Sequence, residues 1–201
     1  MKIVHLIAGI ALSATPSLAE ETAQLDAHEH GVGQLNIAFD ENKIAMELHA
    51  PGADIVGFEY GAKSDADLAA IDGALQTLSD PLGLFSIPEA ASCIVILAHA
   101  ELESENSDHG EEGHDEHDEE GHDDHDEESH DDHDEAPSHT EFHAEYLLEC
   151  ANLTEISAIT FPYFEIFPNA LELEVQVISD KGATAFEIER DLAKLDLRGI
   201  F

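Results

Sequence analysis

Basic residues are scarce in this 201-residue chain, which has 7 Lys and Arg against 46 Asp and Glu and a formal net charge of −39. Nucleic acids and anionic membrane surfaces are bound through clustered Lys and Arg, so this balance excludes both as partners and favours a cation. The chain also has no Trp and only two Cys, too few for a disulfide-dense small protein or a Cys₄ zinc module. With 43% apolar residues it still has enough material for a core.

Long hydrophobic runs are absent as well. Residues 3–12 are apolar except for His5, follow a short basic start and precede small residues at Ser17 and Ala19. This pattern predicts a signal peptide over residues 1–19, cleaved after Ala19. The alternative, a membrane anchor, needs about 20 apolar residues. We therefore expect a protein without a membrane anchor, exported to an oxidising compartment such as a bacterial periplasm.

Residues 20–201 are expected to form a single α+β domain. Alternating apolar residues predict a β-hairpin over 34–49, with Ile44, Met46 and Leu48 facing inward. Ser64 with Asp67 predicts a capping box at the start of one amphipathic helix that Pro81 ends, while residues 53–60 are a loop or a short strand. Further strands are expected over residues 91–102, 140–150, 171–178 and 183–188. The predicted architecture is an antiparallel sheet of about five or six strands with one main helix packed on it.

The two cysteines lie near the start of one predicted strand and the end of another. If Cys93 lies opposite Cys150, a disulfide closes the 56 residues between them. The alternative, a redox or thiolate metal site, has no C-x-x-C motif to support it. In this register His99 lies opposite Ala144 and His143 falls on the other side of the sheet, so both could bind one ion only with a bulge or another register.

Residues 104–137 are a low-complexity segment with an internal repeat of eight. Residues 113–120 read GHDEHDEE, 121–128 read GHDDHDEE and 129–136 read SHDDHDEA. Residues 101–135 contain twenty acids, seven His and no Lys or Arg. Because almost no large apolar residues accompany them, we expect a disordered loop inserted between two strands.

This loop has the chemistry of a cation trap. Neutral imidazole is a good ligand for Zn²⁺, Cu²⁺ and Ni²⁺, and the surrounding carboxylates complete or support the coordination. We expect several exchanging Zn²⁺ ions, with Cu²⁺ or Ni²⁺ less favoured. Calcium has no use for imidazole, and a solvated acidic spacer needs no His at a fixed period. The candidate ligands in the loop are His109, His114, His117, His122, His125, His130 and His133.

The remaining histidines are more ambiguous. His28 and His30 are two residues apart and would point the same way in an extended segment, as a ligand pair or as ordinary surface residues. His139 and His143, near the end of the loop, are further candidate ligands. For these two, and for His49 and His99, a plain polar role is an equal alternative.

Several segments together resemble the ZrgA-like periplasmic zinc uptake proteins. They are the motif His28-Glu29-His30-Gly31, the segment PGADIVGFE at residues 51–59, a His/Asp/Glu insertion between Cys93 and Cys150, and Phe167-Pro168 followed by LELEVQ at 171–176. The sequence departs from the expected pattern at Gly52, where Ala is expected.

The resemblance implies a non-enzymatic zinc-binding protein that acts when zinc is scarce and hands the metal to the zinc-binding protein of an ABC importer. It places metal ligands at His28 and His30 and in the His-rich loop. A buffer that sequesters excess Zn, Cu or Ni is the alternative. An interaction module with a basic partner is a third class, and the absence of H-E-x-x-H or G-x-S-x-G motifs argues against a metalloenzyme.

Overall fold

The computed structural model describes residues 29–104 and 139–200. The predicted signal peptide, His28 and the seven candidate ligands from His109 to His133 lie outside these residues.

The chain begins with the predicted β-hairpin. Strands β1 (Val32–Asp40) and β2 (Lys43–Pro51) pair in antiparallel fashion, and Asp40 lies opposite Lys43 at the turn. Alternate residues on each strand are buried, including Ile37 and Met46, because side chains on a strand point to opposite faces. The prediction of a hairpin with one buried face is confirmed.

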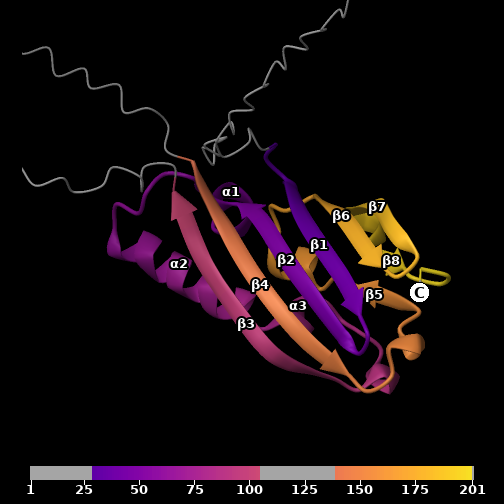
Figure 1. The fold of residues 1–201 in the computed structure, drawn as a ribbon. Helices are drawn as coiled ribbons and strands as arrows, with labels where there is room; N and C mark the ends of the chain where they lie inside the picture. Colours follow the sequence, from indigo (N-terminus) through magenta and orange to yellow (C-terminus); the bar gives the residue numbers. More distant parts are fainter. Residues whose placement is uncertain (1–28, 105–138, 201) are drawn as a thin grey trace, which may run out of the picture.

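Six strands form the main sheet, in the order β3-β4-β2-β1-β6-β7 (Figure 1). The added strands are β3 (Cys93–Ser104), β4 (Thr140–Cys150), β6 (Glu172–Ser179) and β7 (Gly182–Glu189). Strands β1 and β6 pair in parallel, so the sheet is mixed and the prediction of an antiparallel sheet is wrong. Strands β4 and β1 run in the same direction, because both are antiparallel to β2. The long connection over residues 151–171 lets β6 start at the same end of the sheet as β4, so β6 pairs in parallel with β1.

A second, two-stranded sheet and short helices cover one face of the main sheet. The small sheet pairs β5 (Ala158–Thr160) with β8 (Lys194–Asp196). The longest helix is α2 (Asp65–Leu78), and its predicted capping box is confirmed, since the Ser64 hydroxyl accepts from the Asp67 N–H at 3.2 Å. The other helical turns are α1 (Gly52–Ile55), α3 (Pro81–Leu84), α4 (Tyr163–Ile166), η1 (Glu89–Ala91), η2 (Leu153–Glu155) and η3 (Arg190–Leu192).

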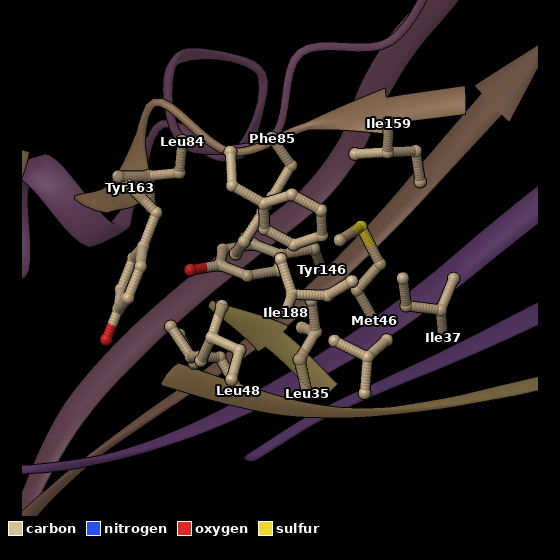
Figure 2. Close-up of a cluster of buried hydrophobic side chains, with 14 of the residues drawn as sticks. Leu35, Ile37, Met46, Leu48, Leu84, Phe85, Tyr146, Ile159, Tyr163 and Ile188 are labelled. Atoms are coloured by element: carbon tan, nitrogen blue, oxygen red, sulfur yellow. The ribbon is translucent and has the colours of Figure 1, made fainter. Parts of the chain in front are cut away.

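The core lies between this layer and the sheet. Figure 2 shows Phe85 at its centre, among residues from the sheet, such as Met46 and Tyr146, and from the covering segments, such as Ile159. Phe85 packs edge-to-face against Tyr146, with ring centroids 6.1 Å apart, and stacks on Tyr163 at 6.3 Å. Burial of these large side chains provides the main driving force for holding the helices against one face only.

The predicted disulfide joins Cys93 to Cys150, which are opposite each other on β3 and β4. A bulge between Val95 and Leu97 then shifts the register by one residue. His99 consequently lies opposite Glu145 instead of Ala144, and the prediction that His99 and His143 face opposite sides is wrong. Because one extra residue on one strand reverses the facing of every later side chain, both histidines lie on the uncovered face.

The uncovered face of the sheet carries polar side chains such as Glu47 and Glu145, beside exposed apolar ones such as Leu97. At one end of it β2 and β3 finish and β1 and β4 begin, close to α1 (Figure 1). Within residues 29–104 and 139–200, no helix has the length and apolar character that crossing a bilayer would require.

Candidate metal centre

Two neighbouring strands each present a histidine on the uncovered face. His49, near the end of β2, and His143, near the start of β4, are directly opposite each other in the antiparallel register. Their flanking residues, including Leu48 and Phe142, point into the core, so strand alternation directs both imidazoles outward. Their rings meet edge-to-face with centroids 4.0 Å apart.

Glu141 completes the cluster. It precedes His143 by two residues on β4, and its Oε2 lies 2.7 Å from His143 Nε2 and 3.7 Å from His49 Nδ1. One nitrogen or oxygen atom from each of the three residues can be chosen so that all lie within 4.8 Å of one another. The Glu141 side chain is only 13% exposed, which limits the positions its carboxylate can take.

This geometry suits one tetrahedral ion. Zinc bonds of about 2.0–2.1 Å to nitrogen and oxygen place neighbouring ligands about 3.3 Å apart. The two distances to Glu141 Oε2, 2.7 and 3.7 Å, lie on either side of that value. Two imidazoles and a carboxylate are a donor set for zinc and other first-row metals rather than for calcium, which takes oxygen ligands. Three protein ligands leave a fourth position open.

Further carboxylates surround the cluster. Glu47 Oε1 lies 3.3 Å from His49 Nε2, and Glu103 Oε2 lies 3.6 Å from His143 Nε2. They add negative charge around the position of a cation and can accept hydrogen bonds from the imidazoles, which orients a metal-binding ring.

The ionisation of the cluster follows from these contacts. Burial alone raises the pKa of Glu141, but the hydrogen bond with His143 and the nearby His49 imidazole outweigh it and lower the pKa to about 2. The Glu141 carboxylate, 3.7 Å away, raises the pKa of His49 above 6.5, although partial burial opposes it, and Glu47 raises it further. The carboxylate is therefore ionised at neutral pH, while a proton on His49 competes with a metal ion.

A second group of ligand-type side chains gathers at the same end of the domain. Oε2 of Glu59, in the loop after α1, lies 2.9 Å from His30 Nε2 and 2.9 Å from His139 Nδ1. His30 precedes β1 and His139 precedes β4. Residues 29 and 80 positions away in the chain thus reach the same carboxylate oxygen.

The structure brings together some of the histidines predicted from the sequence. His143 joins the cluster with His49, whereas His30 and His139 meet at Glu59. His99 shares the outward face with His143 but is 59% exposed and lies 3.8 Å from Glu101, outside both groups.

Sequence reasoning missed three residues of these groups. Glu141 and Glu59 were not predicted as ligands, and His49 was given an equal chance of a plain polar role. The motif Glu141-x-His143 on an alternating strand was a signal for a ligand pair. The pairing of β2 with β4, nearly a hundred residues later in the chain, carried no sequence signal.

The fold and the cluster together define a class: an α+β domain with a solvent-facing His₂Glu donor set suited to a divalent transition metal. A family model described as ZrgA family zinc uptake protein matches residues 27–197. The chain therefore belongs to the ZrgA family of zinc uptake proteins, as the resemblance in its sequence predicted. A comparison with curated proteins gives no match. The family and the disulfide together indicate a zinc-related role outside the cytoplasm.

Proposed function

We propose that this protein captures Zn²⁺ in the periplasm and assists zinc uptake by passing the ion to the zinc-binding protein of an ABC importer. The observation that carries the proposal is the convergence of His49, Glu141 and His143 on the uncovered face of a domain from a zinc uptake family. The proposal assigns the protein no catalytic activity.

The open coordination position supports transfer over permanent storage. Structural zinc sites are closed by four protein ligands, whereas three ligands leave room for an incoming donor to attack the ion. His49 and His143 are 25% and 21% exposed, so a ligand from another protein can approach them from solvent. Release then proceeds by exchange of one ligand at a time.

The His-rich segment supplies a reservoir in this proposal. Its two attachment points, Ser104 at the end of β3 and Thr140 at the start of β4, are paired with each other at the end of the sheet that holds the cluster. Seven imidazoles and many carboxylates tethered there raise the local cation concentration next to the cluster.

Zinc titration against a chromophoric chelator tests the metal centre. The background for this titration is a variant of the mature full-length chain in which seven histidines are replaced by Gln, so that the segment contributes no imidazole. The replaced residues are His109, His114, His117, His122, His125, His130 and His133. On this background, Glu141→Gln or the pair His49→Gln and His143→Gln should each weaken one zinc site by at least about 100-fold, since loss of an outer partner already weakens binding 10–100-fold. His99→Gln is the matched control and should leave zinc binding unchanged. Equal affinity in all variants would refute the centre.

A growth experiment separates uptake from sequestration of excess metal. Deleting the gene should slow growth on medium treated with a zinc chelator, and the Glu141→Gln variant should fail to restore it. If the deletion instead impairs growth only under excess zinc or copper, the protein is a buffer. The handover itself is measured by mixing the zinc-loaded protein with the metal-free importer binding protein and following the zinc content of each after separation.

A further inference from the structure

The uncovered face of the main sheet carries an uninterrupted apolar row. Cross-strand pairing aligns one apolar residue from each of the six strands in this row, namely Leu97, Leu147, Ala45, Ala38, Ile178 and Ala183. Residues that are directly opposite each other share a face of the sheet. Ala45 is four residues before His49 on β2, so strand alternation places the row on the face of the metal centre. Leu97 and Ile178 are 49% and 44% exposed there.

A hollow of about 510 Å³ follows the apolar row. Its lining includes Ala38 and Ala45, in the middle of the row, and the larger Leu147 and Ile178 on the strands to either side. Two small side chains between larger ones leave a depression in the face. One bulky apolar side chain from outside the domain would fill it, as buried anchor residues do in protein interfaces.

A second hollow, of about 620 Å³, adjoins the first, and Asn36 and Gln176 line both. It also contains Glu174 and Glu187, which are directly opposite each other on β6 and β7. Like charges in this position destabilise a sheet, and a basic group placed between them would remove that cost. Among the residues that line the two hollows, none is Lys or Arg.

We propose that the two hollows form the docking surface for the protein that receives the zinc ion, and that this protein presents a bulky apolar side chain bordered by Lys or Arg. The first hollow takes the apolar side chain. Glu47 and Glu145 in the lining of the first hollow, with Glu174 and Glu187 in the second, take the basic groups. The inference rests on the proposed function, because the partner is the recipient of the metal.

The docking surface lies beside the metal centre. The row that contains His143 and His49 continues across β1 and β6 with Gln34 and Glu174, which line the second hollow. The apolar row is four residues away along β2, or about 13 Å from His49. A partner seated on both hollows therefore lies next to the open coordination position and can offer a donor atom before the ion leaves its first ligands.

Charge and size indicate the kind of partner. A second copy of this chain would bring its own carboxylates against Glu174 and Glu187, and its 7 basic residues are too few to balance 46 acidic ones. Six strands about 4.8 Å apart and rows about 13 Å apart give a face of roughly 24 by 13 Å. Such a face is smaller than the roughly 800 Å² per partner of a standard stable interface, so the complex should be transient. A transfer partner has to leave with its ion.

Zinc transfer to the metal-free zinc-binding protein of the importer tests the surface. The donor is the zinc-loaded full-length background with Gln at the seven histidines from His109 to His133. The transfer rate should rise with acceptor concentration and fall as salt is added, because opposite charges steer the encounter. Ala45→Phe, which fills the first hollow, and Glu174→Lys with Glu187→Lys, which reverse the charge of the second, should each slow transfer by at least about tenfold.

Matched substitutions in the covering layer are the controls. Ala69→Phe on α2 adds the same side chain at an exposed alanine, and Glu155→Lys with Glu165→Lys in η2 and α4 make the same change in net charge. Both should transfer zinc within about twofold of the unsubstituted rate. Titration with a chromophoric chelator should give every variant the same zinc affinity within about threefold. Circular dichroism reports folding, and if Ala45→Phe does not fold, the charge-reversal pair decides the outcome.

Each other result overturns the docking surface. Unchanged transfer in a folded docking variant, or equal slowing in the controls, would do so and leave the proposed function intact. So would a transfer rate that is independent of acceptor concentration and equal to release into a chelator, because the ion would then pass through solution. A dimer in analytical ultracentrifugation that Ala45→Phe abolishes would assign the hollow to a second copy instead. No transfer from the unsubstituted protein would refute both the surface and the handover.

Discussion

His49 on β2 and His143 on β4 are directly opposite each other, and their rings meet edge-to-face with centroids 4.0 Å apart. Both rings also lie near Oε2 of Glu141, His143 at 2.7 Å and His49 at 3.7 Å. In an antiparallel pair such residues share a face at close distance, so a histidine on each strand is enough to bring two imidazoles together. The carboxylate two residues along β4 then supplies the third donor.

The first prediction concerns the protonation of His49. Because the nearby Glu141 carboxylate raises the pKa of His49, the metal-free protein should show a His49 titration midpoint above 6.5 in NMR spectra of the ring protons. Glu141→Gln should move the midpoint downward. A midpoint that is unchanged by this substitution would contradict the assigned contact.

Zinc binding should follow the same titration. Zinc binds the neutral ring of His49, so below the His49 midpoint it must displace a proton to bind. The zinc affinity should therefore fall by about tenfold per pH unit below that midpoint and be constant above it. Zinc affinity measured between pH 5.5 and 8.5 in Glu141→Gln should level off at a lower pH than in the unsubstituted protein, although the affinity itself is weaker.

The second prediction concerns acid stability without metal. Glu141 has a pKa of about 2 in the folded protein against 4.5 when unperturbed, so between these values the unfolded chain binds more protons. Its contribution to the free energy of unfolding is therefore complete above pH 4.5 and disappears as the pH falls toward 2. Urea unfolding should show that the difference between the unsubstituted protein and Glu141→Gln shrinks across this window. A difference that stays constant from pH 6 to pH 2 would argue against the ionised, hydrogen-bonded carboxylate.

The third prediction concerns the disulfide. Cys93 and Cys150 are 57 positions apart, and the chain-entropy relation gives about 4 kcal/mol for closing a loop of that length. Replacing both cysteines by serine should lower the free energy of unfolding by roughly this amount in urea titrations. Reducing the unsubstituted protein should give a similar loss, whereas the substituted protein should not respond to the reductant. A loss under about 1 kcal/mol would mean that the chain-entropy relation does not hold here.

The fourth prediction concerns Gly52, where the sequence departs from the expected Ala. A Cβ at this position would collide with Thr140 Oγ1 and would lie 2.7 Å from the Phe58 carbonyl oxygen. Gly52→Ala should therefore destabilise the protein by about 1–3 kcal/mol, as overpacking does. It should also weaken zinc binding, because Thr140 separates His139 from Glu141.

The same substitution at Gly73 is the matched control. Gly73 lies within α2, and nothing lies within 4 Å of an added Cβ there. Gly73→Ala should stabilise the protein by about 0.5–1 kcal/mol through its higher helix propensity. Thermal or urea unfolding of the two variants should therefore shift in opposite directions, and equal effects would refute the steric explanation for Gly52.

Local features of the fold could be predicted from the sequence. The alternation around Ile37 and Met46 depends only on a strand having one buried face, and the Ser64–Asp67 capping box depends on groups within one helical turn. The pairing of Cys93 with Cys150 also followed from the positions of the two strands. The first two require no knowledge of the order of strands in the sheet, and the disulfide requires only that β3 and β4 are neighbours.

The parallel contact of β1 with β6 could not be predicted in this way. The alternation of buried and exposed residues along a strand is the same whether its neighbour is parallel or antiparallel. Which of the two pairings forms depends on how the connection through α4 packs against the core. The bulge after Val95 could not be predicted either. One extra residue leaves the local alternation of apolar and polar residues almost unchanged, and yet it moves His99 to the face of His143.

The sequence by itself determined that this protein favours a cation, through its acidic balance and its abundant histidines, and that its chain forms a sheet with a cross-strand disulfide. Only the tertiary structure decided which histidines meet. His49 reaches His143, and His30 reaches His139 through Glu59, because distant segments pack at one end of the sheet. Such contacts depend on burial summed over the whole core and on strand order, which no local stretch of sequence contains.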